Sequence, residues 1–292
     1  IKTLATAPEE KIHKLWDGLG YYTRCNNFIA LAPFIYKNLE GKFPEKYEDI
    51  LSLKGIGNYT ASAIASFAFN QPYAVLDGNV FRVLSRFFGK EVPINTTEGK
   101  KFYGDLSQLL LDKKKPADYN QAIMDFGAVI CKPLLPLCVE CPFKNECVAF
   151  QYNKVSVLPI NTKIITQKER FFNYIIVEYN HNIYIQKRVE KDIWQNLYEF
   201  LLIETESSIN ETDLFKHEKF LFYFSKKKFE IENISKKSQK LTHQIIKGQF
   251  FHIKVSNPLK NYGNYFIVTK EEIKLLPFPK LIASYFTDKM YL

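Results

Sequence analysis

The sequence predicts a multidomain protein in which an all-α domain precedes an α+β domain, and three observations support this. A chain of 292 residues has room for two ordinary domains. Apolar residues recur at helical spacing in the first half, whereas short β-type runs dominate the second half. The content of 46% hydrophobic and 15% aromatic residues is that of a folded chain. We therefore expect a helical domain at 1–152, a linker at 153–170 and an α+β domain at 171–292.

Seven segments of the first domain have the apolar spacing of a helix with one buried side. They are Glu10–Leu19, Asn26–Leu39, Tyr47–Leu53, Ala61–Phe69, Asn79–Phe88, Gly99–Leu111 and Asn120–Ile130. Turn-forming residues, such as those around Pro44 and Pro116, separate these segments.

The second domain contains β-branched and aromatic runs of strand length. The expected strands are Phe172–Tyr179, Ile183–Lys187, Leu197–Ile203, Phe220–Phe224, Leu241–Ile246, Phe250–Val255 and Tyr265–Thr269. Helices are expected near Glu211–Glu218 and from Lys270 onward. The segment Asn153–Gln167 has no clear periodicity and is interpreted as a linker.

The net charge of +9 is concentrated in residues 153–292, which carry 22 Lys and Arg against 15 Asp and Glu. A basic surface suits nucleic acid, although many lysines serve only solubility. No apolar run has the length of a membrane span and no secretory leader is visible, so we expect no membrane partner and a bacterial cytoplasmic location. The first residue is Ile1, which indicates a processed chain or a fragment.

The cysteines form the strongest chemical signal. Cys131, Cys138, Cys141 and Cys147 lie within one short segment, and Cys25 stands apart. Because the number of cysteines is odd and four of them are clustered, the pattern argues against a secreted disulfide framework and for a metal or cluster site. Four thiolates suit either zinc or an iron–sulfur cluster, and zinc sites usually pair two C-x2-C units where this chain has one.

A second signal is the turn Leu53-Lys54-Gly55-Ile56-Gly57 between two expected helices. Glycines at alternate positions let a phosphate approach backbone amides at a helix start, although an ordinary helix–helix turn is the plainer alternative. Further along, Asp77 precedes another helix and is a candidate N-cap or a functional carboxylate.

The chain resembles the endonuclease III and MutY superfamily of DNA glycosylases, in which a glycine turn, an aspartate and a four-cysteine motif follow one another in the same order. The resemblance covers nearly the whole chain. It implies an all-α helix-hairpin-helix glycosylase domain with a [4Fe–4S] cluster on the four cysteines, DNA contacts from Lys54, Gly55 and Gly57, and a catalytic role for Asp77.

Tyr59 separates the branches of this superfamily. It stands where endonuclease III-type enzymes carry a lysine, so a Schiff-base step has no obvious nucleophile here. The resemblance is therefore to the monofunctional MutY type and implies that Tyr59 and Asn79 help to place the sugar or water. A half-buried structural aromatic is the alternative for Tyr59.

Two further runs resemble the MutY type. Gly18-Leu19-Gly20-Tyr21-Tyr22-Thr23-Arg24 is similar to a signature whose first tyrosine wedges into DNA beside 8-oxoguanine, which implies that role for Tyr21. Trp194–Phe200 is similar to a motif of the appended Nudix-like domain that recognises 8-oxoguanine.

Leu241-Thr242-His243 stands in place of that domain's F-S-H loop. Thr keeps the hydroxyl of Ser, whereas Leu lacks the stacking surface of Phe. The alternative is that Thr242 and His243 only belong to a strand. The glutamate cluster of an active Nudix hydrolase is absent from the sequence, so nucleotide hydrolysis is not expected.

The resemblance implies a monomeric base-excision repair enzyme that removes adenine mispaired with 8-oxoguanine or guanine in duplex DNA. The family's general-acid glutamate pattern, S-E-x-x-L-Q-Q-T, does not occur in this sequence, so we expect an N-terminally truncated chain that is inactive alone. The alternatives are a thymine-mismatch glycosylase, a catalytically silent binder of damaged DNA and a zinc-containing DNA-binding protein.

Overall fold

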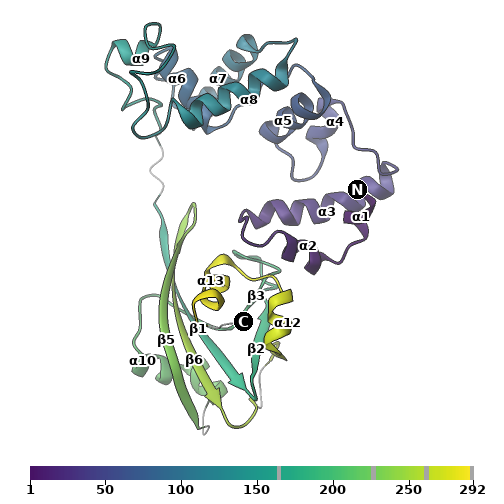
Figure 1. The fold of residues 1–292 in the computed structure, drawn as a ribbon, viewed down its shortest axis with the longest axis vertical. Helices are drawn as coiled ribbons and strands as arrows, with labels where there is room; N and C mark the ends of the chain where they lie inside the picture. Colours follow the sequence, from purple (N-terminus) through teal and green to yellow (C-terminus); the bar gives the residue numbers. More distant parts are fainter. Residues whose placement is uncertain (163–165, 225–227, 260–262, 290–292) are drawn as a thin grey trace. The chain divides into compact units, whose positions relative to one another are not determined.

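The computed structural model describes residues 1–162, 166–224, 228–259 and 263–289 (Figure 1). Its contacts divide the chain into two compact units. The helical unit comprises Lys37–Ile164, and the sheet unit combines Ile1–Tyr36 with Ile165–Leu292. The first 36 residues therefore pack with the sheet, which helical periodicity alone does not reveal.

The helical unit confirms the all-α prediction. Its helices are α4 (Tyr47–Ser52), α5 (Asn58–Phe69), α6 (Gly78–Phe87), α7 (Thr97–Leu110), α8 (Pro116–Val129) and α9 (Val148–Gln151). Side chains cap two of them at the N-terminus, Asp77 on α6 and Thr96 on α7. A buried cluster of Val80, Leu84 and Tyr103 joins these two helices.

Residues 153–162 of the segment expected to be a linker are bound to the helical unit, and its last three residues already belong to strand β1, which begins at Lys168. The Ile94 amide donates to the Ile160 carbonyl over 3.0 Å, and Arg86 Nε donates to the Leu158 carbonyl over 2.9 Å. Residues 163–165, also part of the expected linker, lie outside the described residues.

The sheet unit is α+β, as predicted. Its strands are β1 (Lys168–Tyr179), β2 (Asn182–Lys187), β3 (Tyr198–Glu199), β4 (Leu201–Thr205), β5 (Phe229–Lys240), β6 (Gln244–Val255) and β7 (Phe266–Val268). The strand order is β3-β2-β1-β6-β5, with β4 also paired to β1 and β7 to β2. Strands β1 and β6 run parallel, and the other pairs are antiparallel.

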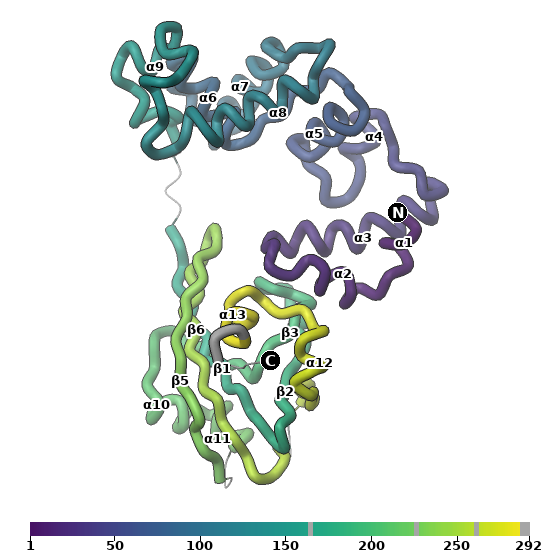
Figure 2. Tube along the Cα trace, in the orientation of Figure 1, coloured from purple at the N-terminus to yellow at the C-terminus, as the bar shows by residue number. Residues whose placement is uncertain are grey.

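Helices cover both faces of this sheet, as Figure 2 shows. They are α10 (Glu211–Lys216), α11 (Glu218–Phe224), α12 (Lys270–Leu275) and α13 (Lys280–Lys289). Residues of α12 and α13 pack on the face that carries Phe172 and Phe250, here called the α13 face. Residues of α10 and α11 pack on the face that carries Phe251 and Ile253, here called the α11 face.

The prediction of a strand at Phe220–Phe224 is wrong, because these residues form part of α11. Phe220 and Phe224 are one helical turn apart and stack with their ring centroids 4.5 Å apart, so both reach the core from one side of the helix. A short apolar run fits either a strand or a buried helix. The sequence also missed β5, and it split the continuous strand β6 in two.

The first helices, α1 (Lys2–Thr6), α2 (Glu9–Leu15) and α3 (Tyr22–Asn38), contribute to the sheet unit up to Tyr36. Tyr22 packs against the core of the α13 face. Lys14 Nζ donates to the Leu276 carbonyl over 3.0 Å, and the Tyr198 hydroxyl donates to Glu10. Among the described residues, no helix is long and apolar enough to cross a membrane.

Candidate functional site

Asp77 lies immediately before α6 and is half-buried. Its Oδ1 accepts from the Val80 backbone amide over 2.8 Å, which makes it the N-cap of the helix. Its Oδ2 accepts from Asn79 Nδ2 over 3.0 Å. Both oxygens are therefore held by hydrogen bonds, which confirms Asp77 as an N-cap and leaves its functional role a prediction.

Asn79 is in turn fixed by Arg82, a buried residue on the next turn of α6. Arg82 Nη2 donates to Asn79 Oδ1 over 2.8 Å and to the Gly127 carbonyl over 2.7 Å. Arg82 Nε donates to the Cys131 carbonyl over 2.6 Å. Burial lowers the pKa of Arg82. This side chain links Asp77, through Asn79, to the start of the cysteine loop.

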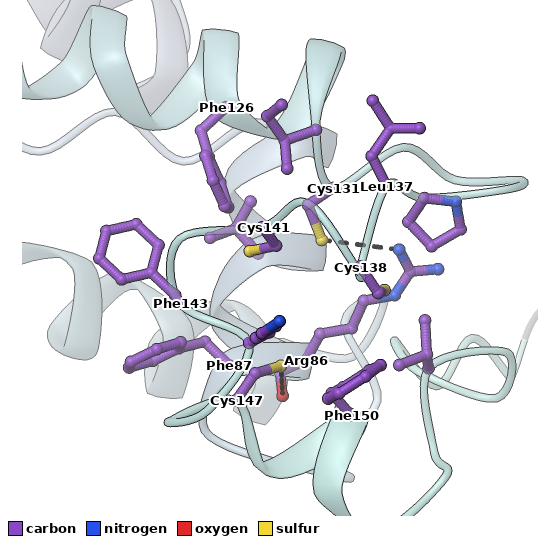
Figure 3. Close-up of a pocket in the computed structure, with 15 residues that line it drawn as sticks. Arg86, Phe87, Phe126, Cys131, Leu137, Cys138, Cys141, Phe143, Cys147 and Phe150 are labelled. Carbon is purple, nitrogen blue, oxygen red and sulfur yellow. Dashed lines mark hydrogen bonds between the residues drawn. The ribbon is translucent and has the colours of Figure 1, made fainter.

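The four cysteines of that loop line one cavity of about 40 Å³ (Figure 3). Phe126, Phe143 and Phe150 also line it. Arg86, buried on α6, places Nη1 3.6 Å from Cys131 Sγ and donates to the Lys132 carbonyl over 2.7 Å. The loop thus presents four thiols, and α6 presents one guanidinium, to an otherwise largely apolar pocket.

Burial and the neighbouring thiols raise the pKa of two of the four cysteines. Burial and then the neighbouring Cys131 and Cys147 raise the pKa of Cys138, and burial raises the pKa of Cys141. Because several thiolates crowded together need compensating positive charge, this donor set fits a soft metal centre.

The glycine turn joins α4 to α5. Gly55 has φ +87, a left-handed conformation that suits glycine, and Gly57 is the residue before α5 with open space where a side chain would begin. Lys54 beside them is exposed. The exposed turn and the start of the 12-residue helix fit the predicted anion site.

Tyr59 lies on the first turn of α5 and is 43% exposed. Within the described part of the chain, no hydrogen bond or ring contact joins it to Asp77 or Asn79. Of the three predicted catalytic residues, the structure therefore brings two together directly.

Tyr21 lies in the turn before α3 and is 71% exposed. Its φ is +47, and the preceding Gly18 and Gly20 also have positive φ values. The Arg24 guanidinium lies 4.7 Å from the centre of its ring. Since the next residue, Tyr22, packs into the sheet core, the turn is anchored while the Tyr21 ring projects.

Thr242 and His243 are exposed in the turn between β5 and β6, so they do not belong to a strand. Leu241 beside them packs against the core of the α13 face. Gln167 Nε2 donates to the Leu241 carbonyl over 2.9 Å, and the Lys168 amide donates to the His243 carbonyl over 3.1 Å. The expected strand start at Leu241 is therefore wrong, because regular β6 pairing begins at Gln244.

Sequence reasoning missed Arg82, Arg86 and Gly127. A Cβ on Gly127 would lie 2.7 Å from the Cβ of Asn79, so α8 approaches α6 closely there. The two arginines stand four residues apart among apolar residues of α6, and this spacing was the available signal for buried, bonded side chains.

Comparison with known proteins agrees with this fold. Residues 1–99 match the model of HhH-GPD superfamily base excision DNA repair proteins, and residues 173–288 match that of the NUDIX domain. The chain therefore combines the helical domain of a base excision DNA repair protein with a NUDIX domain.

Over 248 residues the chain is 33% identical to the adenine DNA glycosylase of Buchnera aphidicola subsp. Schizaphis graminum (strain Sg), covering 84% of this chain and 67% of the relative. Over 200 residues it is 34% identical to that of Buchnera aphidicola subsp. Acyrthosiphon pisum (strain APS), covering 68% and 57%. The chain belongs to the adenine DNA glycosylase family, which confirms the predicted MutY type.

The chain spans 57% of the length of one of these relatives and 67% of the other. A thermostable thymine-DNA glycosylase of known structure is 30% identical, with a TM-score of 0.48, over 52% of this chain and 70% of that one.

Proposed function

We propose that this protein hydrolyses the N-glycosidic bond of adenine mispaired with 8-oxoguanine or guanine in duplex DNA. The observation that carries the proposal is the Asp77 carboxylate, half-exposed at the start of α6 and oriented by the Val80 amide and the Asn79 side chain. Family membership supplies the base and the reaction class.

Cleavage of a glycosidic bond builds positive charge on the sugar. A fixed carboxylate stabilises that charge without having to reorient, and this is the role we assign to Asp77. Asn79 holds the carboxylate, and Tyr59 and Asn79 help to place the sugar or the attacking water. Because position 59 carries no amine, the reaction ends at the abasic site.

Several exposed groups would bind the DNA. Lys54, Gly55 and Gly57 suit a backbone phosphate at the start of α5. Tyr21 would insert beside 8-oxoguanine and offset part of the cost of unstacking. Thr242 and His243 would contact the lesion by hydrogen bonding.

The four cysteines would hold a [4Fe–4S] cluster, which supplies a cationic cross-link for the loop. The single C-x2-C unit, where zinc sites usually pair two, supports this over a single zinc ion. Purified protein should be brown and contain about four irons per chain. Colourless protein with one zinc would overturn the assignment, and Cys141→Ser should lose the visible absorbance.

The test of the reaction is a single-turnover assay on duplexes with one A·8-oxoguanine, A·G or T·G pair, followed by alkali. Adenine release that falls by about 10²–10³-fold in Asp77→Asn supports the proposal. Thymine release from the T·G duplex would favour the thymine-mismatch alternative instead.

The same assay tests the expectation, drawn from the missing general-acid glutamate pattern, that this chain is inactive alone. No adenine release, although the protein binds the A·8-oxoguanine duplex more tightly than an A·T duplex, would agree with that expectation and with the silent-binder alternative. A monomeric state and a bacterial cytoplasmic location complete the proposal.

A further inference from the structure

The part of the β5–β6 hairpin nearest its turn has a strongly one-sided charge. Residues 233–252 contain four lysines and no aspartate or glutamate. The turn at the end of this hairpin carries Thr242 and His243. The lysines therefore flank a turn to which the proposed function already gives a DNA contact.

Strand register gathers three of these lysines on one face. Ser238 pairs with Lys247, so these two side chains point to the same face of the sheet. Lys236 and Lys240 lie two residues on either side of Ser238 and share that face, because side chains alternate along a strand. Each stands diagonally across from Lys247, at about 7–8 Å between Cα atoms.

The fourth lysine, Lys237, lies on the opposite face, where its Nζ donates to the Ser284 carbonyl of α13 over 2.9 Å. Its ammonium group is therefore hydrogen-bonded within the fold, and it is not counted with the other three lysines. We call Lys236, Lys240 and Lys247 the lysine face.

The lysine face continues the α11 face of the sheet toward the turn. Farther from the turn, Phe251 and Ile253 on that face are buried in the core together with residues of α10 and α11. Near the turn, a hollow of about 520 Å³ replaces that core, and Lys236, Lys247 and Ser208 line part of it.

Among the described residues that line the hollow, one is acidic. Glu169 also lines the hollow, and its Oε1 lies 3.5 Å from Lys247 Nζ. It offsets one of the three positive charges, and Lys236 and Lys240 are exposed. The surface therefore has a net positive charge, which favours the binding of a polyanion.

We propose that the lysine face binds the sugar–phosphate backbone of duplex DNA, an inference that rests on the proposed function. Lysine ammonium groups bind phosphates regardless of base sequence, so these contacts orient a protein on the duplex. A rigid hairpin holds the lysines next to Thr242 and His243. Backbone contact at this face would therefore present the turn to the bases.

The test compares two triple variants of the whole chain in binding to a fluorescein-labelled A·8-oxoguanine duplex, measured by anisotropy over a salt series. One variant replaces Lys236, Lys240 and Lys247 by Gln. The control replaces three exposed lysines of α10, α11 and α12 by Gln, with the same change of net charge. These are Lys216, Lys219 and Lys274.

The lysine-face variant should lose about tenfold or more in affinity at low salt, and its plot of log K against log salt should become less steep by about 2 to 3. The control should keep the slope of the unaltered protein, and Lys→Arg at the three face positions should restore it. Circular dichroism melting curves should be the same for both Gln variants, because the replaced side chains are exposed.

An unchanged slope in the lysine-face variant would overturn the inference while leaving the proposed function intact. An equal loss in both Gln variants would also overturn it, because only net charge would then matter. If the unaltered protein shows no salt-dependent binding to the duplex, the inference and the proposed function both fail.

Discussion

Around α6, the polar side chains of the candidate site are hydrogen-bonded to one another. At the β5–β6 turn, in contrast, the side chains proposed to contact DNA are exposed to solvent. Asp77 is held by Asn79, and Asn79 by the buried Arg82. In contrast, Thr242 and His243 are exposed, and the turn is fixed mainly through backbone carbonyls.

The difference follows from what each region would do. A group that stabilises a developing charge must not reorient during the reaction, so a hydrogen-bonded support is an advantage. A group that contacts a bound duplex needs an accessible surface. Substitutions in the two regions should therefore differ, with stability and reaction rate affected at α6, and binding alone affected by substitution of the exposed Thr242 and His243.

The largest effect is expected for Arg82→Met. The change leaves the carbonyls of Gly127 and Cys131 without their donor and releases Asn79, so we expect a loss of about 3–5 kcal/mol in stability. The excision rate should fall by about 10²-fold, because Asp77 loses its support.

Thermal melting, iron content and single-turnover excision would measure these changes. Arg82→Lys serves as the comparison and should recover little, since an ammonium cannot reproduce the planar fork of donors. Excision at the unaltered rate in Arg82→Met would show that Asp77 does not depend on this link.

A smaller effect is expected for Gly127→Ala. The added Cβ would lie 2.7 Å from the Cβ of Asn79, so α8 and α6 must separate, at about 1–3 kcal/mol. The matched control is Gly104→Ala on α7, where the nearest atom would be 3.9 Å away. The control should be neutral or slightly stabilising in a melting experiment, because alanine favours helix. Equal melting temperatures for the two variants would contradict the close approach of α8 to α6.

The smallest effects separate Leu241 from its neighbour in the turn. Leu241→Ala removes a side chain packed on the core of the α13 face and should cost about 1 kcal/mol in stability. Thr242→Ala should leave melting unchanged and weaken lesion binding by about 1 kcal/mol, measured by anisotropy against an A·G duplex. The comparison of the two regions would lose its basis if Thr242→Ala lowered the melting temperature more than Leu241→Ala.

The sequence predicted the parts of the site that depend on local spacing. The cysteine loop, the glycine turn and the position of Asp77 before a helix all follow from residues close together in the chain. The link through Arg82 did not follow, because its partners Gly127 and Cys131 lie on other segments. Only tertiary packing brings these groups together.

For the fold, too, the sequence predicted elements with a local pattern and missed features that depend on contacts between distant segments. The helices α4 to α8 of the helical unit are periodic and were found within a few residues of their ends, whereas the four-residue helix α9 was missed. β5 was missed because it pairs on one side only and carries polar residues on both faces. The packing of the first 36 residues with the sheet unit depends on contacts such as that of Lys14 with Leu276, which leave no local pattern.

The bond from Arg82 to the Cys131 carbonyl has a consequence for the living cell. The loop that receives this bond is the one that would be organised by iron and sulfide. In iron starvation, newly made protein would carry a loose loop, and the distant carboxylate would lose its alignment. If the proposed function holds, repair of adenine opposite oxidised guanine would then depend on the supply of iron as well as on the amount of protein synthesised.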